Sequence, residues 1–347
     1  MLLTTINLHQ FRNVKNTTYS IGKKLTLVIG ENAKGKTNIL ESILFLLNGT
    51  GFRESKEDEL ILFEKNNGYV EGIFKDKVDV LHYKIYLEKQ NLSTLKVFFL
   101  QKTRKRQCEY LKEQTRAVLF SPEQIEIVIG SPEKRRSYFN TIISLFYPEY
   151  KKKLVNYESA VRKRNKVLEL VHDETRLHQE LLFWNNYLIE QGSFITKTRE
   201  EYISYLNMHP KLDTKEFKIA YQKNEVTKER FLEKYEQEKR MRKTAIGPQK
   251  DDFIIFLKNG FDRNIHHFGS RSEQRLGVFW LKMNEINYTQ EHFDKKPILL
   301  LDDVFSEFDM HNKKLILDLI TSYQTILTTT EEEVVELIDV EKEIIRL

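Results

Sequence analysis

Cysteine is almost absent from this sequence, which has one, Cys108, in 347 residues. A single cysteine excludes an internal disulfide and any metal site built from several cysteines. No stretch approaches the roughly 20 consecutive apolar residues that a membrane-spanning helix needs. The first residues also lack the basic and apolar regions of a secretory signal. We therefore expect a cytoplasmic protein that does not associate with membranes.

The sequence also lacks a strong excess of one charge. Lysine and arginine number 56 against 51 acidic residues, a formal net charge of +5. The basic residues nevertheless form groups, at 102–106, 151–153, 162–166 and 239–243. Such groups can neutralise the phosphates of DNA, or they can be solvated helix faces, since acidic residues lie between them. Charge alone leaves both interpretations open.

A phosphate-binding loop is present near the start of the chain. Residues 30–37 match the pattern G-x-x-x-x-G-K-[ST], between an apolar strand at 25–29 and a helical pattern at 37–47. In this context the backbone amides form a nest for phosphates, the lysine contacts the β- and γ-phosphates, and the threonine hydroxyl binds Mg²⁺. We expect the nucleotide to be bound by Gly30, Glu31, Asn32, Ala33, Lys34, Gly35, Lys36, Thr37 and Asn38.

The acidic partner of this loop lies near the other end of the chain. Residues 298–301 are apolar and lead into Asp302 and Asp303. An ionised carboxylate at the end of a buried strand is costly unless it meets a cation. We therefore expect Asp302 to bind Mg²⁺, with Thr37, and Asp303 to position or activate the attacking water. Lys36, Asp302 and Asp303 are the catalytic candidates.

The pattern of apolar residues divides the chain into three segments. Strand patterns at 69–74 and 97–100 belong to a first segment, 1–131. Residues 132–244 are helical in pattern but sustain no heptads, which favours a compact helical lobe over a coiled coil. Strands and helices alternate again in 245–347. This order predicts one α/β domain that both chain ends build and that a helical lobe interrupts.

A serine-rich turn at 268–275 precedes the last long helix. Ser270 and Glu273 fit a capping box, in which each side chain binds the other's backbone amide. A serine hydroxyl and a helix N-terminus also fit a second anion site. The pattern alone does not decide between these two roles.

These motifs together resemble the RecF family of bacterial repair ATPases, relatives of the SMC and Rad-type ABC ATPases. The similar stretches are Phe11-Arg12-Asn13, Gly30–Thr37, Leu119–Glu123 with Gly130–Pro132 and Arg135-Arg136, Gly247–Asp252, and Leu299–Asp303 with the D-loop at 304–309. The sequence departs from the family pattern at Ser272, where glycine is usual, and at Gln249 and Lys250, where histidine and arginine are usual. The threonines at 328–330 stand where many ABC proteins carry a histidine, which suggests slow hydrolysis.

The resemblance implies an ABC-type P-loop ATPase head. Ser270 would then bind the γ-phosphate held by a second copy of the chain, in trans, so that ATP closes a homodimer. Arg12 and Asn13 would lie beside the nucleotide, and Arg53 is a further candidate. The aspartate at 303 is the RecF form of a position that usually carries glutamate in ABC proteins.

The resemblance also implies a function in recombinational repair and replication. We expect a weak, DNA-stimulated ATPase that binds ATP and Mg²⁺, closes on DNA at gaps or single-strand/duplex junctions, and helps to load recombinase. RecR is the expected partner protein and RecO a further candidate. The alternatives are an ATPase subunit of a transporter, an ATP-gated nuclease or toxin, and a non-catalytic DNA-binding scaffold.

Overall fold

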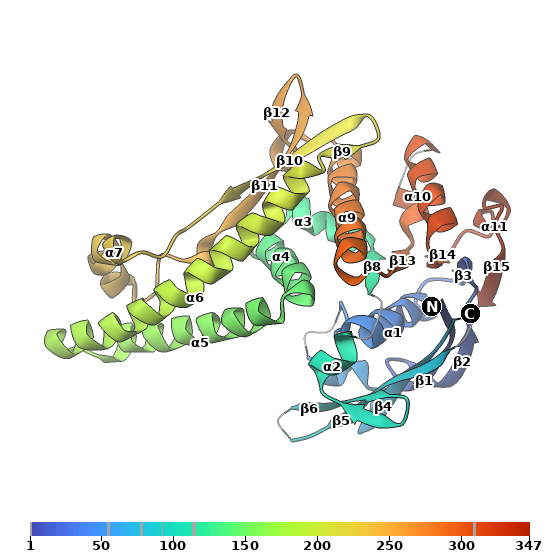
Figure 1. Cartoon of the computed structure of the whole chain (residues 1–347), viewed down its shortest axis with the longest axis horizontal. Helices are drawn as coiled ribbons and strands as arrows, with labels where there is room; N and C mark the ends of the chain where they lie inside the picture. Colours follow the sequence, from blue (N-terminus) through green and yellow to red (C-terminus); the bar gives the residue numbers. More distant parts are fainter. Residues whose placement is uncertain (1, 54–55, 77–78, 92, 113–115, 308–309) are drawn as a thin grey trace. The chain divides into compact units, whose positions relative to one another are not determined.

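The structure is a computed structural model that describes residues 2–53, 56–76, 79–91, 93–112, 116–307 and 310–347 (Figure 1). The chain forms two compact units. The first unit combines residues 1–123 with 285–347, and the second unit comprises residues 124–284. The first unit is therefore built from both ends of the chain, and the α/β fold predicted from the sequence is confirmed.

A five-stranded parallel sheet forms the centre of the first unit. Its strand order is β15-β3-β14-β13-β8, and the strands are β3 (Leu25–Ile29), β8 (Ala117–Phe120), β13 (Ile298–Asp302), β14 (Thr325–Thr329) and β15 (Lys342–Arg346). β3, β8, β13 and β14 are buried along their whole length, as expected of parallel strands covered on both faces. β3, from the N-terminal part, pairs with β14 and β15 from the C-terminal part. The sequence did not predict β15.

A six-stranded antiparallel sheet accompanies the parallel one. Its order is β2-β1-β4-β5-β6-β7, and the strands are β1 (Leu2–Phe11), β2 (Val14–Ser20), β4 (Asn67–Lys75), β5 (Val80–Lys89), β6 (Thr94–Leu100) and β7 (Thr103–Lys105). The remaining helices of this unit are α1 (Lys36–Asn48), α2 (Gln107–Lys112), α10 (Met310–Ser322) and α11 (Val334–Leu337), with short 3-10 turns at Glu57–Leu60 and Val304–Glu307.

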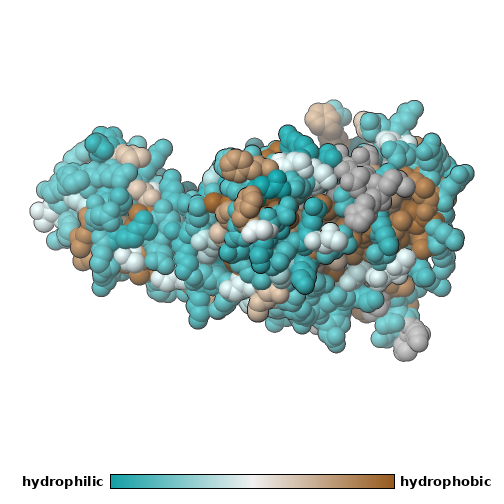
Figure 2. Space-filling view, turned by 90° about the horizontal axis from the view of Figure 1, so that it is seen from above, coloured by the Kyte–Doolittle hydropathy of each residue, from teal (hydrophilic) through white to brown (hydrophobic). Residues whose placement is uncertain are grey.

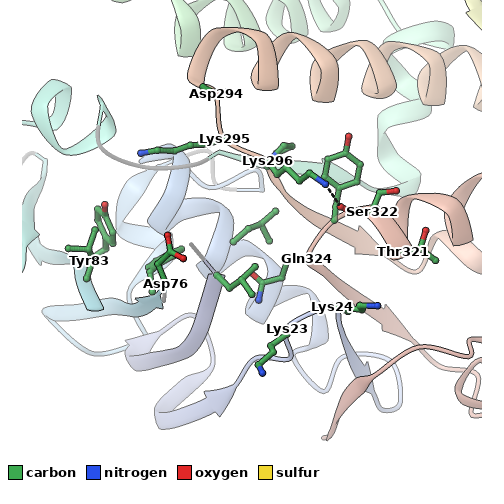
Figure 3. A pocket seen from close by; sticks show the side chains of 16 residues that line it. Lys23, Lys24, Asp76, Tyr83, Asp294, Lys295, Lys296, Thr321, Ser322 and Gln324 are labelled. Atoms are coloured by element: carbon green, nitrogen blue, oxygen red, sulfur yellow. Dashed lines mark hydrogen bonds between the residues drawn. The ribbon is translucent and has the colours of Figure 1, made fainter. Parts of the chain in front are cut away.

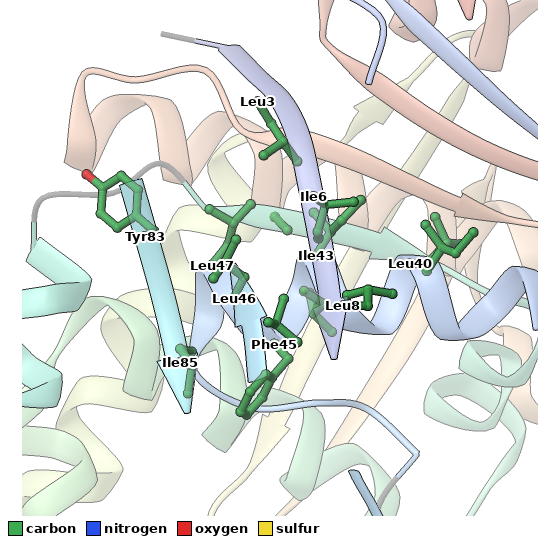
Figure 4. Close-up of a cluster of buried hydrophobic side chains, with 14 of the residues drawn as sticks. Leu3, Ile6, Leu8, Leu40, Ile43, Phe45, Leu46, Leu47, Tyr83 and Ile85 are labelled. Carbon is green, nitrogen blue, oxygen red and sulfur yellow. The ribbon is translucent and has the colours of Figure 1, made fainter. Parts of the chain in front are cut away.

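The core of the first unit lies around α1, whose apolar side chains face those of β1 and β5 (Figure 4). Ile43, Leu46 and Leu47 of α1 are buried in it. A Cβ atom added at Gly72 of β4 would lie 2.4 Å from Cδ2 of Leu46. A larger residue at position 72 would therefore require the Leu46 side chain to move. The helix that follows the phosphate loop is thereby held firmly against the antiparallel sheet.

The second unit combines helices with a small antiparallel sheet of order β12-β11-β10-β9. Its helices are α3 (Glu126–Ile129), α4 (Pro132–Phe146), α5 (Pro148–Leu170), α6 (Glu174–Met208), α7 (Lys228–Met241) and α8 (Ile265–Phe268), and α9 (Arg271–Phe293) leads back to the first unit. The strands are β9 (Lys211–Leu212), β10 (Lys215–Gln222), β11 (Asp252–Asn259) and β12 (Phe261–Asn264). α5 and α6 run side by side (Figure 1).

The helical pattern expected over 132–244 was wrong at β9 and β10. Phe217 and Ile219 of β10 are buried while Lys218 between them is exposed, which is the two-residue period of a strand. β10 pairs with β11 along its whole length except its first residue. Residues 245–284 therefore belong to the second unit, whereas the sequence analysis placed them in the α/β domain, within the segment 245–347.

Two of the stretches that carry the family resemblance bind each other inside the second unit. The guanidinium of Arg135 forms a bidentate ion pair with Asp252, with N–O distances of 2.7 and 2.9 Å. Arg136 donates to the carbonyl oxygen of Asp251 at 2.7 Å. The Asp251 carboxylate accepts from the buried Arg199 at 2.6 Å. The aspartates of the Gly-Pro motif therefore hold α4 and α6 to the small sheet.

One of the basic residues grouped as a DNA contact candidate is buried instead. Arg164 is 1% exposed and forms an ion pair of 2.6 Å with Glu238. Burying a charge requires such a partner. Arg164 therefore joins α5 to α7 and is removed from the candidate DNA contacts.

Figure 2 shows that hydrophilic residues cover most of the face in view. Among the described residues, no helix is long and apolar enough to cross a bilayer.

Candidate nucleotide site

The phosphate loop joins the end of β3 to the start of α1. Ala33 and Gly35 both have positive φ, 66° and 99°, a region that glycine tolerates most readily. A Cβ atom at Gly35 would lie 3.1 Å from the side-chain amide of Asn13. The side-chain oxygen of Asn13 in turn accepts a hydrogen bond of 2.6 Å from the side-chain amide of Asn38. The turn between β1 and β2 thus supports the loop from one side.

The Lys36 ammonium lies across the loop. Nζ donates to the carbonyl oxygens of Gly30 at 2.6 Å and Glu31 at 2.9 Å, and the residue is 8% exposed. These contacts hold the positive charge next to the loop's backbone amides. An anion in the loop would meet both the amides and this charge. Lys34, by contrast, is 54% exposed and lies 3.9 Å from the Glu31 carboxylate.

Asp302 and Thr37 meet although they come from opposite ends of the chain. The Thr37 hydroxyl donates to Oδ1 of Asp302 at 3.1 Å, and the Thr328 hydroxyl donates to the same oxygen at 2.7 Å. Burial raises the pKa of Asp302 above its ordinary value, and the two hydroxyl bonds offset part of that rise. The carboxylate is therefore held in an environment that favours a bound cation.

Asp303 has a left-handed backbone conformation, with φ of 50°. Its amide donates to both the carbonyl oxygen and the hydroxyl of Thr328, at 3.2 and 3.1 Å. Strained backbone of this kind persists where the surroundings over-determine it, often at functional sites. Thr328 thus fixes both aspartates.

A pocket of about 400 Å³ connects these groups, within the usual size range of small-molecule sites. It is lined by Asn32, Ala33, Gly35, Lys36, Thr37, Asn38, Arg53, Pro122, Glu123, Asp302 and Asp303. Sequence reasoning missed Glu123, which follows β8 and whose charge also raises the pKa of Asp302. The signal in the sequence was its place just after the apolar run 117–120. The structure shows that this run is β8, which pairs with β13 and so brings Glu123 to the pocket.

A buried carboxylate that the sequence analysis also missed organises the wall beside the loop. Glu41 is fully buried and accepts hydrogen bonds from Arg12 at 2.7 and 2.8 Å and from Arg53 at 3.0 Å. Arg53 also donates to Asn38. Burial alone would raise the pKa of Glu41, but the two guanidinium groups outweigh it and hold this pKa below its ordinary value. Arg12 therefore points to Glu41, and its contact with a nucleotide stays a prediction.

The oxygen atoms of Thr37 and Asp302 fit a Mg²⁺ site. Mg²⁺ binds oxygen ligands at about 2.1 Å in octahedral geometry, so neighbouring ligands lie about 3 Å apart. The observed separation of 3.1 Å matches this edge. Both are oxygen donors, the ligand type that Mg²⁺ prefers.

Ser270 belongs to the second unit, and its turn forms the capping box expected from the sequence. Its amide donates to the Glu273 carboxylate at 2.8 Å, and the Glu273 amide donates to the Ser270 hydroxyl at 3.2 Å. Ser270, Arg271 and Ser272 are all exposed. The turn is therefore rigid and accessible to another molecule. Residues 308–309 of the expected D-loop lie outside the described residues.

A phosphate loop that faces an acidic strand end across a parallel sheet defines the P-loop class of nucleotide-binding proteins. A family model described as "RecF/RecN/SMC N terminal domain" matches residues 2–346. The proteins named DNA replication and repair protein RecF from Natranaerobius thermophilus and Clostridioides difficile are 35% and 32% identical to this chain, over 96% and 95% of it and 92% of each relative. The chain belongs to the RecF family.

A solved structure agrees with this assignment. The structure described as the recombination mediator protein RecF-ATPrS in the RecFOR pathway superposes with a TM-score of 0.86 at 28% identity. The match covers 100% of this chain and 96% of that one. The fold is thus the ABC-type ATPase head that the resemblance implied.

Proposed function

We propose that this protein is an ATP-binding protein of DNA replication and recombinational repair, with slow ATP hydrolysis. One observation carries the proposal. Lys36, Thr37 and Asp302 come from opposite ends of the chain and meet in one polar pocket of about 400 Å³. The names of the relatives and the ATP-analogue complex of a similar RecF support both the nucleotide and the cellular role.

Each residue of the pocket has a role in this proposal. Lys36 and the loop amides neutralise the β- and γ-phosphates, and Thr37 and Asp302 hold Mg²⁺, which neutralises charge on the phosphates when bound. Asp303 orients the attacking water or accepts its proton. Thr328 keeps the two aspartates in place through its hydroxyl and carbonyl groups. The remaining loop residues contribute backbone amides.

ATP closes a homodimer in this proposal. The support is the exposed turn at Ser270, whose hydroxyl and amides are fixed by the capping box but remain accessible. In the RecF resemblance this serine binds the γ-phosphate held by the other copy. The pocket of one copy then needs the turn of its partner to be complete.

DNA is the proposed macromolecular ligand, at gaps or single-strand/duplex junctions, with ATP turnover stimulated by it. Lys102, Arg104 and Arg106 are exposed on and beside β7, the edge strand of the antiparallel sheet. They are the candidate phosphate contacts, which position DNA without reading its sequence. RecR and RecO are the proposed partners in recombinase loading, because a similar protein is described as a mediator of the RecFOR pathway.

Sedimentation velocity with and without ATP and Mg²⁺ tests the dimer. We expect ATP to convert monomer to dimer, and Ser270→Asp to prevent this while fluorescent ATP still binds. Aspartate is as good a helix cap as serine, but its charge repels the γ-phosphate. Ser270→Thr, which keeps the hydroxyl, is the matched control and should still dimerise. A Ser270→Asp variant that dimerises normally would contradict the proposed role of Ser270.

DNA binding is measured separately, by anisotropy over a salt series. Affinity should rise with ATP and fall steeply with salt, since phosphate contacts release counterions. Binding that is indifferent to both ATP and salt would contradict the proposal that an ATP-closed homodimer holds DNA through its phosphates.

A further inference from the structure

A second pocket of about 670 Å³ lies at the opposite ends of the strands that build the nucleotide site (Figure 3). Lys23 and Lys24 precede β3, Lys295 and Lys296 precede β13, and Tyr323 precedes β14. The same three strands carry the phosphate loop, Asp302 and the Thr328–Thr329 pair at their far ends. Five-residue strands span about 17 Å, so the two pockets are separate.

The floor of this pocket is apolar and preformed. Phe74, Leu81 and Ile298 contribute to it. The buried side chain of Gln324 fixes the chain beneath, since it accepts from the amide of Leu3 at 3.0 Å and donates to the carbonyl oxygens of Leu3 and Gly22 at 2.7 and 2.8 Å. A ligand would therefore meet a surface that needs little reorganisation, which lowers the cost of binding.

The rim carries an excess of positive charge. Four lysines and two aspartates, Asp76 and Asp294, line the pocket, a formal charge of +2. The lysines come from two segments, 23–24 and 295–296, which lie on different sides of the pocket in the view (Figure 3). Lys296 donates to the carbonyl oxygen of Ser322 at 3.1 Å and lies 5.5 Å from the ring centre of Tyr323. Lys23 and Lys24 are exposed and form no ion pair with a described residue.

We propose that this pocket docks an acidic peptide segment of a partner protein, with a bulky apolar side chain seated on the floor. Lysine ammonium groups on flexible stems suit carboxylates in irregular positions. The lysines alone would accept either carboxylates or phosphates, and the apolar floor of Phe74, Leu81 and Ile298 favours a peptide, which can carry a bulky apolar side chain beside its carboxylates. An apolar floor within a basic rim selects for both properties of the peptide.

Fluorescence anisotropy with a short labelled peptide tests this docking site. The probe is a run of aspartate and glutamate with two central leucines. It should bind, and Lys23→Glu with Lys24→Glu should weaken it by about tenfold or more, since two attractive rim charges become repulsive. A peptide with serines in place of the leucines should bind the unchanged protein about as weakly as the leucine peptide binds the Lys23→Glu, Lys24→Glu variant.

Lys15→Glu with Lys65→Glu is the matched control, because both lysines are exposed in the same unit and the change in net charge is equal. This variant should bind the peptide normally. Equal loss in both variants, or no loss in either, would overturn the proposal. An oligonucleotide of the same length is tested in parallel. If it binds more tightly than the peptide, and if Lys23→Glu with Lys24→Glu weakens its binding as much as that of the peptide, the proposal is overturned in favour of nucleic acid. Fluorescent ATP binding and ATP-dependent dimerisation should be unchanged, so the docking site can fail without the nucleotide function failing.

Discussion

Two carboxyl groups in the first unit show how environment sets the behaviour of a single residue. Glu41 and Asp302 are both buried. Glu41 has two arginines against it, and its pKa is lowered. Among the described residues, the hydrogen-bond donors to Asp302 are the hydroxyl groups of Thr37 and Thr328, and burial raises its pKa. The two arginines offset the charge of Glu41 within the chain, whereas a bound cation would be needed to do the same for Asp302.

Asp303→Asn should separate nucleotide binding from hydrolysis. The amide keeps the shape of the side chain but removes the charge that we propose orients water, so turnover should fall on the order of 10²-fold or more. ATP binding should persist and the dimer should stay closed. Phosphate release and sedimentation measure the two effects. Asp339→Asn, at an exposed position of the same unit, is the control; equal turnover in both variants would remove Asp303 from the catalytic group.

Glu41→Gln should destabilise the first unit by about 2 kcal/mol at neutral pH, because two arginines lose their buried partner. The folded-state pKa of Glu41 lies below its unfolded value, near 4.5. Its stabilising effect is therefore present above that pH and is lost as the pH falls through the folded-state pKa. Urea unfolding of both proteins at successively lower pH should show the difference shrinking. A difference that stays constant on acidification would mean that the charge of Glu41 does not stabilise the fold.

At the scale of elements, the turn before β11 and its two aspartates link α4, α5 and α6 to the small sheet. Gly247 has φ of 120° and ψ of 173°, a region that is almost exclusive to glycine. A Cβ atom there would lie 2.0 Å from the Tyr157 hydroxyl. Tyr157 donates that hydroxyl to Gln249. Gln249, which stands where the family usually has histidine, is thus hydrogen-bonded to α5 through Tyr157.

Gly247→Ala should lower the stability of the second unit by about 3 kcal/mol or more, since backbone strain adds to a steric clash. Gly260→Ala is the matched control: its φ is 76°, but a Cβ atom there meets nothing within 4 Å. It should cost only about 1–2 kcal/mol. Thermal melting measures both. Tyr157→Phe should recover part of the loss in Gly247→Ala, and a failure to recover any would mean that strain alone is responsible.

The sequence predicted elements whose signals are local. The phosphate loop, β3 and the helix after the loop have their own motifs or periodicity, and the structure has the strand and the helix as expected. Features that depend on distant partners were missed. Glu123 reaches the nucleotide pocket only because β8 pairs with β13. The buried guanidinium of Arg164 is satisfied by residues distant in sequence, above all by Glu238, 74 positions away.

At the scale of the whole molecule, the two units differ in how they depend on chain continuity. The second unit is one segment, 124–284, whereas the first needs both chain ends. In the parallel sheet, β3 lies between β14 and β15, and both of these strands come from the C-terminal part.

A fragment of residues 124–293, which keeps the whole of α9, should therefore fold alone and melt cooperatively. A fragment of residues 1–123 should not, because β3 and β8 lack their neighbours. Circular dichroism and heteronuclear NMR of the two fragments check this. Mixing the fragment 1–123 with 285–347 is the complementation control. A well-folded 1–123 fragment would show that the antiparallel sheet suffices for that unit.

The contact between Thr37 and Asp302 has a consequence for biosynthesis. The two residues are 265 positions apart. Ribosomes add roughly 5–20 residues per second, so on the order of 10–50 s separates the synthesis of the loop from that of its acidic partner. β15, which pairs with β3 beside the loop, follows later still. The nascent chain thus carries its phosphate loop for that time before Asp302 is present, and the nucleotide pocket can be completed only after β13 has been synthesised.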